Sequence, residues 1–172
     1  MKNSLVLLLV AAIGTLVSAQ VWTPAGDKIR TAFSDNLDPA RPWPEYPRPQ
    51  LQRAQWLNLN GLWDYAIVTR GAACPETFDG KILVPFAIES SLSGVGKKVG
   101  EANELWYHRT FTVPDTWKNK TILLNFGAVD WQADIWVNEV KVASHRGGYT
   151  PFSINITPAL SKAKSQTVTV KV

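Results

Sequence analysis

The chain has 172 residues, 45% of them hydrophobic, which is enough for one domain with its own core and excludes wholesale disorder. Its net charge of +4 is spread along the chain without a basic cluster, so we expect no nucleic-acid partner. Eight tryptophans are unusual. Most of them fit a buried core, although an indole face also stacks on sugar rings.

The first residues have the pattern of a secretory signal peptide. Lys2 precedes an apolar run at residues 5–17, and the small residues Val17-Ser18-Ala19 predict cleavage before Gln20, so residues 1–19 form the signal. A membrane anchor is the weaker alternative, because the run is too short to span a bilayer comfortably. We therefore expect a secreted or periplasmic protein without membrane contact after cleavage. Cys74 is the single cysteine, which excludes an internal disulfide.

Residues 20–55 form a Pro-rich arm. Five prolines lie between positions 39 and 49, and this density disfavours a helix and predicts an extended strap along the surface. We expect four aromatic residues to hold the strap in place, namely Trp22, Phe33, Trp43 and Tyr46. A Pro-rich ligand for a partner domain is the alternative.

Short segments with alternating polarity follow the arm, and they predict about seven strands. The segments are residues 56–68, 81–84, 105–113, 121–126, 129–138, 140–144, 152–157 and 167–172. Residues 86–99 are rich in Ser and Gly and predict a mobile, surface-exposed loop. A single helical turn is predicted at Thr157-Pro158, and no longer helix after the signal. The pattern predicts an all-β fold, either a sandwich or a jelly roll.

Two further expectations concern strand residues. His108 and Arg109 lie on opposite faces of the strand at 105–113, and we expect one of them to pair with a buried acid. The sequence ends at Val172 within a strand, so we expect the last strands of the sandwich to be missing and the chain to be a C-terminally truncated product.

Six motifs in order resemble the N-terminal sugar-binding domain of glycoside hydrolase family 2, the family of β-galactosidases, β-glucuronidases and β-mannosidases. They are Leu59-Asn60-Gly61-Leu62-Trp63, Ile82-Leu83-Val84-Pro85-Phe86, Leu105-Trp106-Tyr107-His108-Arg109-Thr110-Phe111, Phe126-Gly127-Ala128-Val129, Ile135-Trp136-Val137-Asn138 and Gly147-Gly148-Tyr149-Thr150-Pro151-Phe152. The resemblance covers about residues 50–172 and implies a galactose-binding-domain-like jelly roll at residues 56–172. Relatives often have Gly where this chain has Glu139, which leaves the turn type of that hairpin open.

The resemblance also implies where the chemistry takes place. In this family an immunoglobulin-like domain and a (β/α)₈ barrel follow, and the barrel holds the acid/base and nucleophile glutamates of a retaining reaction. A barrel needs about 250 residues, for which this chain has no room. Its own acids do not replace the pair: Asp130 and Asp134 would lie about 13 Å apart along a strand, against the roughly 5–5.5 Å of a retaining site. We therefore expect no catalytic residue in this chain.

Other kinds of site find no support in the sequence. Two histidines and one cysteine are too few for a zinc centre, and no phosphate-binding loop occurs, so we expect no metal and no cofactor.

Five residues are candidates for carbohydrate contact: Asn103, Asp130, Trp131, His145 and Arg146. Asn103 is a candidate because the first domain of related galactosidases lends an Asn to the edge of the active site. An acid beside an indole at Asp130-Trp131 suits sugar recognition, and the alternative is a core Trp131 with Asp130 capping a turn. His145-Arg146 offers donors next to a Gly-Gly pair, which the needs of a turn explain equally well.

The sequence thus predicts the sugar-binding domain of an exported family 2 glycosidase, β-galactosidase-like by preference. Such an enzyme hydrolyses O-glycosyl bonds in carbohydrate metabolism once this domain is joined to its barrel. The expected partners are a β-glycoside and the immunoglobulin-like and barrel domains of the same protein, and a homo-oligomeric parent stays open. The alternatives are a stand-alone carbohydrate-binding module and a non-catalytic scaffold for oligomer contacts.

Overall fold

The computed structural model describes residues 22–172 except 27, 28 and 30, and eight strands carry its fold. The strands are β1 (Gly61–Thr69), β2 (Gly80–Val84), β3 (Asn103–Thr112), β4 (Leu123–Phe126), β5 (Gln132–Val137), β6 (Val140–Arg146), β7 (Phe152–Asn155) and β8 (Ser165–Lys171). One short α-helix and four 3₁₀ turns join them, namely α1 (Ala32–Asp35), η1 (Pro49–Leu51), η2 (Ser91–Ser93), η3 (Asp115–Trp117) and η4 (Thr157–Ala159). The signal peptide predicted at residues 1–19 lies outside the described residues and stays a prediction.

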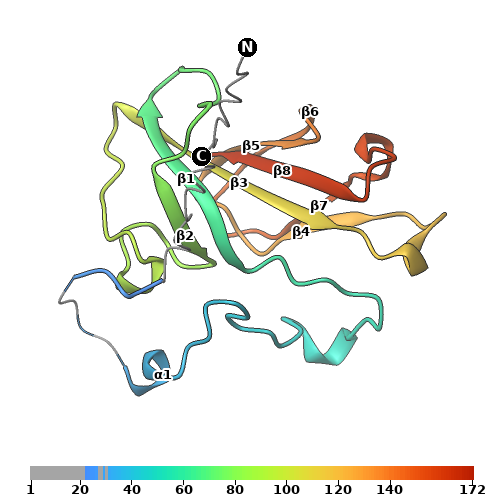
Figure 1. Ribbon diagram of the computed structural model, residues 1–172, viewed down its shortest axis with the longest axis horizontal. Helices are drawn as coiled ribbons and strands as arrows, with labels where there is room; N and C mark the ends of the chain where they lie inside the picture. Colours follow the sequence, from blue (N-terminus) through green and yellow to red (C-terminus); the bar gives the residue numbers. More distant parts are fainter. Residues whose placement is uncertain (1–21, 27–28, 30) are drawn as a thin grey trace, which may run out of the picture.

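All strand pairs are antiparallel. Six strands form one sheet in the order β2-β1-β3-β8-β5-β6, and β4 and β7 form a second sheet (Figure 1). No helix of the described residues exceeds the four residues of α1. The prediction of an all-β jelly-roll sandwich is therefore confirmed, as is the single helical turn at Thr157-Pro158.

The core lies between the two sheets because alternate residues of each strand point inward. Ile135 and Val137 of β5 and Val168 of β8 have no exposed surface, and Leu124 of β4 and Ile154 of β7 meet them from the opposite sheet. The residues between these positions point to the outer face of the large sheet, as the period of two requires.

The loop at residues 86–99 differs from its prediction because part of it is buried. Ile88 belongs to the core, and Ser93 has no exposed surface. The single hydrogen of the Ser93 hydroxyl is within reach of the carbonyls of Ser90 (2.8 Å) and Ile88 (3.0 Å), and the oxygen accepts from the Val95 amide (3.0 Å). The loop thus satisfies its own polar groups and closes over the sheet instead of extending into solvent.

The β5–β6 hairpin turns at Asn138-Glu139, as predicted. Both residues have positive φ, 47° and 68°, which is the requirement of a type I′ turn, and Val137 pairs with Val140. The Asn138 side chain donates to Gln166 (2.6 Å) and accepts from the Thr167 amide (2.9 Å), so β8 holds the turn in place. Glu139 therefore keeps the I′ geometry without the glycine that would adopt it more easily.

The arm runs below the strands in Figure 1, where it is coloured blue to teal. Tyr46 packs on Trp56 with ring centroids 4.7 Å apart, and Trp43 lies 6.2 Å from Phe86. The prediction for Phe33 is wrong: its side chain is 80% exposed, because α1 buries Ser34 instead.

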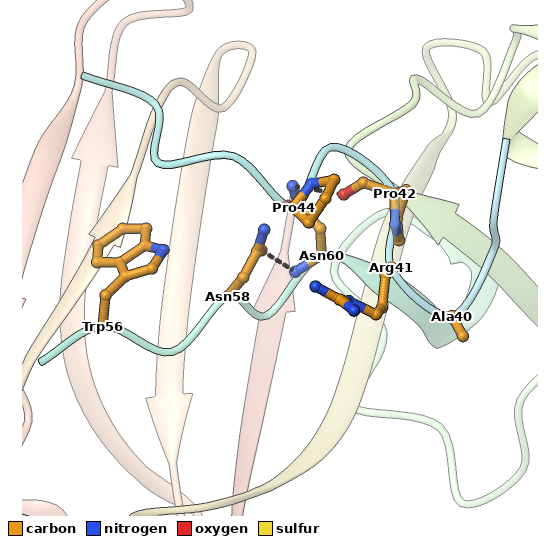
Figure 2. A pocket seen from close by; sticks show the side chains of 7 residues that line it. All are labelled: Ala40, Arg41, Pro42, Pro44, Trp56, Asn58 and Asn60. Carbon is orange, nitrogen blue, oxygen red and sulfur yellow. Dashed lines mark hydrogen bonds between the residues drawn. The ribbon is translucent and has the colours of Figure 1, made fainter. Parts of the chain in front are cut away.

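The strand predicted from residue 56 begins five residues later, at Gly61. Residues 56–60 belong instead to the contact with the arm, since Asn58 donates to the Trp43 carbonyl (3.0 Å) and Asn60 donates to the Pro42 carbonyl (3.4 Å). A cavity of about 240 Å³ lies between residues 40–44 and residues 56–60 (Figure 2). The domain division at residue 55 stays a prediction.

The buried acid expected beside His108 or Arg109 is a wrong prediction. Arg109 donates to the carbonyls of Leu59 (2.8 Å) and Asn60 (3.0 Å), and burial lowers its pKa. His108 shares a hydrogen bond with the Thr169 hydroxyl (3.0 Å) and stacks on a neighbouring phenylalanine. Backbone carbonyls accept from Arg109 and a hydroxyl pairs with the His108 ring, so the partners that the structure shows for these two side chains are not carboxylates.

Candidate functional site

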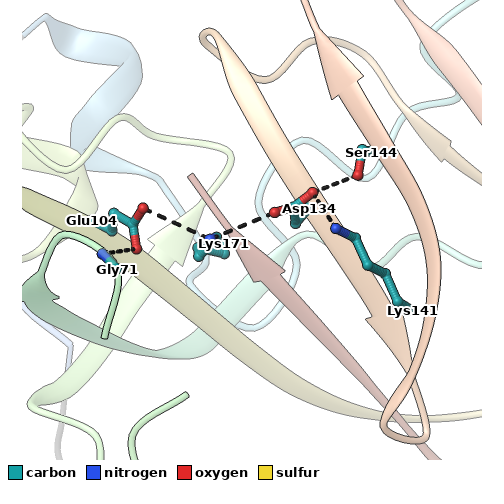
Figure 3. A network of polar contacts seen from close by, with 6 residues as sticks. All are labelled: Gly71, Glu104, Asp134, Lys141, Ser144 and Lys171. Carbon is teal, nitrogen blue, oxygen red and sulfur yellow. Dashed lines mark hydrogen bonds and ion pairs between the residues drawn. The ribbon is translucent and has the colours of Figure 1, made fainter. Parts of the chain in front are cut away.

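A polar network on the outer face ties four strands together near one end of the large sheet (Figure 3). Lys171 of β8 lies between Glu104 of β3 (3.7 Å) and Asp134 of β5 (3.5 Å). Asp134 also pairs with Lys141 of β6 (2.8 Å) and accepts from the Ser144 hydroxyl (2.5 Å). These contacts fix the relative position of β3, β8, β5 and β6.

The network decides the charge of Asp134. Burial alone would raise the pKa of this carboxyl, but the hydrogen bonds from Lys141 and Ser144 and the charges of Lys141 and Lys171 outweigh it and hold the pKa below its ordinary range. Asp134 is therefore an anion that its neighbours already engage, and it is not available as a catalytic acid.

The five predicted site residues lie at this end of the sheet. Asn103 opens β3, Asp130 and Trp131 precede β5, and His145 and Arg146 close β6. The register aligns Trp106 of β3 and Asp134 of β5 with Lys171 between them, so the starts of β3 and β5 share one level. Two strand spacings, about 9–10 Å, separate β3 with Asn103 from β5, and three, about 14 Å, separate it from β6 with His145 and Arg146.

Asn103 faces its own loop. Its side-chain amide donates to the Val99 carbonyl at 2.7 Å, so this contact positions residues 99–103. A carbohydrate contact by Asn103 stays a prediction.

Trp131 lies at the surface and not in the core. Its side chain is 58% exposed, which removes the alternative of a core tryptophan. The Arg146 guanidinium lies over the indole, 6.0 Å from the ring centroid, and the Trp131 carbonyl accepts from the Gly147 amide at 2.7 Å. Arg146 therefore places hydrogen-bond donors beside an open aromatic face.

Asp130 packs against the glycine turn that follows Arg146. A Cβ atom added to Gly148 would lie 2.8 Å from Cγ and 3.1 Å from Cβ of Asp130, closer than real contacts allow. The Gly-Gly pair therefore serves the close approach of this turn to Asp130. Asp130, Trp131 and Arg146 together offer an acceptor, a stacking surface and a donor, which is the chemistry of sugar recognition.

His145 points to the inner face, unlike Arg146. Its ring stacks on Phe152 with centroids 3.9 Å apart, and its Nε2 lies 3.1 Å from the Gly147 carbonyl. Sequence reasoning missed Tyr149, which follows the glycine pair and is 95% exposed. Its place in a Gly-Gly-Tyr turn was the available signal.

The part of the chain that the structure describes contains neither a metal-binding cluster of side chains nor a membrane-spanning helix. No group of three or more His, Cys, Asp or Glu side chains lies close enough together to hold a metal ion. Within the same residues, no helix has the length and hydropathy of a membrane-spanning segment.

Comparisons with known proteins identify the family. The profile of "Glycosyl hydrolases family 2, sugar binding domain" matches residues 94–172, a shorter range than the motifs cover. A β-glucuronidase of Paenibacillus borealis is 28% identical over 133 residues, 74% of this chain and 22% of the relative. A β-galactosidase of Thermoanaerobacter pseudethanolicus is 40% identical over 52 residues, 30% of this chain and 7% of the relative.

A solved structure agrees with the sequence matches. The β-glucuronidase of Lactobacillus rhamnosus superimposes with a TM-score of 0.54 at 30% identity, covering 66% of this chain and 20% of that one. The chain thus spans about a fifth of the length of the two glucuronidases, 22% and 20%. The family predicted from the motifs is confirmed: this chain carries the sugar-binding domain of glycosyl hydrolases family 2.

Proposed function

We propose that this chain is the N-terminal, carbohydrate-recognising part of a β-glucuronidase-like hydrolase, and that it contacts sugar through the sheet end around Trp131. One observation carries the proposal: an exposed indole has the Arg146 guanidinium over its ring and follows Asp130, whose carboxylate lies against the neighbouring Gly148. A monomeric domain gains nothing in stability from exposing an indole, whereas a sugar ring buries it. The surrounding strands are fixed by the network on the outer face, so the residues are held ready for a ligand.

Glucuronide is the substrate class we propose for the parent enzyme, in place of the galactoside expected from the sequence. The support lies in the extent of the matches: 133 residues align with the Paenibacillus β-glucuronidase and only 52 with the Thermoanaerobacter β-galactosidase. We place bond cleavage in a further domain of the same polypeptide. The resemblance implies two glutamates in a barrel, and the described acids form no such pair around Trp131.

Calorimetric titration of the full chain tests the recognition step. We expect methyl β-D-glucuronide to bind with a millimolar Kd, about −4 kcal/mol, and methyl β-D-galactoside to bind more weakly. Trp131→Ala should weaken glucuronide binding about tenfold or more, because it removes the stacking surface. Trp43→Ala is the matched control, since Trp43 is also an exposed indole but lies on the arm. No binding by the unaltered chain, or an equal loss in both variants, would refute the proposal.

Two other functions give different results in the same preparation. A stand-alone carbohydrate-binding module would bind sugar, and a natural stop would follow Val172 in the gene. A scaffold for oligomer contacts would bind no sugar and would sediment as a dimer. Sequencing downstream of Val172 into an immunoglobulin-like and a barrel region would support the multidomain enzyme.

We also propose export by a signal peptide, on the pattern of Lys2, the apolar residues 5–17 and the small residues before Gln20. Intact-mass measurement of protein from the medium or periplasm should give a chain beginning at Gln20. A chain that keeps residues 1–19 and stays inside the cell would contradict export.

A further inference from the structure

We infer that His145 is a positioning residue of the carbohydrate site, holding Trp131 and Arg146 in place from the inner face of the sheet without contacting the ligand. The inference rests on the proposed function. It changes the role expected from the sequence, in which His145 was a direct contact. The reason is that both recognition features of the imidazole, its face and its Nε2 atom, are already engaged inside the protein.

The face of the imidazole belongs to an aromatic column. His145 of β6 stacks on Phe152 of β7 at 3.9 Å with an interplanar angle of 14°, and Phe152 stacks on Phe126 of β4 at 4.9 Å and 13°. The column joins the end of β6 to the small sheet. Three rings in near-parallel contact restrict the rotation of each one, so the orientation of the imidazole is set by packing.

The edge of the imidazole continues into the turn. The Gly147 carbonyl can only accept, so Nε2 of His145 carries the hydrogen and donates across 3.1 Å. The amide of the same Gly147 donates to the Trp131 carbonyl at 2.7 Å. Gly147 thus receives one hydrogen bond from His145 and gives one to Trp131, and its φ of 122° is a conformation that needs such support.

The turn at Gly147-Gly148 positions the groups that face the ligand. Arg146 lies between His145 and Gly147 in sequence, and its guanidinium stacks over Trp131. Gly148 follows and fits against Asp130 without room for a side chain. A loosened Gly147 would therefore let the donor, the indole and the acceptor move relative to one another. Affinity would fall although every group that touches sugar is still present.

Two variants separate the hydrogen bond from the packing. His145→Phe keeps the stack on Phe152 and loses the donor, whereas His145→Gln loses the stack and keeps a donor at the position of Nε2. His108→Phe is the matched control, because His108 also combines an aromatic stack with one hydrogen bond but lies elsewhere in the fold.

The first measurement needs no ligand. Amide hydrogen exchange by NMR on the full chain should show the Gly147 N–H exchanging about 3- to 10-fold faster in His145→Phe, the equivalent of one lost hydrogen bond. Exchange at Gly147 should stay near the unaltered rate in His145→Gln and in His108→Phe. Unchanged exchange in His145→Phe, or equal acceleration in all three variants, would overturn the inference.

The second measurement is titration with methyl β-D-glucuronide. We expect His145→Phe to bind about 3- to 10-fold more weakly and His145→Gln to recover most of that loss. Unchanged affinity in His145→Phe with a loss only in His145→Gln would show that packing alone matters, and the positioning role through Gly147 would be refuted. If the unaltered chain does not bind the glucuronide, the proposed function fails while the exchange experiment still decides whether His145 orders the turn.

Discussion

Replacing Gly148 with alanine should disturb the candidate site by steric overlap with Asp130. An added Cβ would lie 2.8 Å from Cγ and 3.1 Å from Cβ of Asp130, so one of the two segments must move. Gly148 does not have a positive φ, so the cost is steric and not conformational. Overpacking of this kind costs about 1–3 kcal/mol, and we expect the lower half of that range because Asp130 is at the surface and can rotate.

Gly127→Ala is the matched control. A Cβ on Gly127 meets nothing within 4 Å, and its φ is not positive either. Alanine there should leave the free energy of unfolding unchanged or raise it by about 0.4–1 kcal/mol, because it restricts the unfolded chain. The same substitution therefore has opposite expected effects at two glycines from two of the six motifs.

A double-mutant cycle with Asp130→Ala identifies the cause of the loss. Without the carboxyl group only the 3.1 Å contact with Cβ remains, so Gly148→Ala should cost about 0.5–2 kcal/mol less in the Asp130→Ala background. Urea unfolding followed by tryptophan fluorescence measures all four proteins, with equal m-values as the condition for comparison. If Gly148→Ala is no less stable than Gly127→Ala, or costs the same with and without Asp130, the steric reasoning is wrong.

Three further changes test other parts of the structure. Because the pKa of Asp134 is held below its ordinary range, its stabilising contribution is present above the pKa of an unfolded Asp, about 4, and is lost as the pH falls through the folded pKa. Asp134→Asn should cost about 1–3 kcal/mol at pH 7, and this difference should vanish in acid melts. Arg109→Met removes the donor of the Asn60 carbonyl, while the Leu59 carbonyl keeps its bond from Trp63 Nε1, so the change should cost about 1–3 kcal/mol by urea unfolding, with Arg109→Lys recovering part; full stability in Arg109→Met would contradict the role of these bonds. Glu139→Gly should raise the thermal midpoint, since about 1–2 kcal/mol of left-handed strain exceeds the entropy cost of glycine; a lower midpoint would count against the I′ turn.

Most strands could be predicted from the sequence because their signals are local. Each of these signals, the alternation in β3, β5 and β8 and the Asn138-Glu139 turn, is contained in a few consecutive residues. The period of two then fixes which side chains of a strand face the core. Glu139 left the turn type open, because the contacts that hold Asn138 come from β8, about thirty residues away in the chain, beyond the range of any turn rule.

The wrong predictions likewise concern side chains whose contacts the local sequence pattern does not show. The loop at residues 86–99 has the composition of an exposed segment. Only the fold shows that the Ser93 hydroxyl bonds to the backbone around it, which lets part of the loop be buried. Either His108 or Arg109 was expected to pair with a buried acid, yet Arg109 donates to the carbonyls of Leu59 and Asn60 from 50 and 49 residues away. Charge in a sequence indicates that a partner is required, but not whether that partner is a carboxylate or the backbone.

The candidate site combines both situations. The sequence could bring Trp131 near Arg146, because β5 and β6 form a hairpin and residues flanking its strands must meet. It could not show what each of the two neighbours contacts, His145 an aromatic column on the inner face and Arg146 the exposed indole of Trp131. Adjacent residues on a strand always point to opposite faces. A pair of candidate donors in consecutive positions at the end of a strand should therefore be expected to divide, with one touching the ligand and the other holding the first in place.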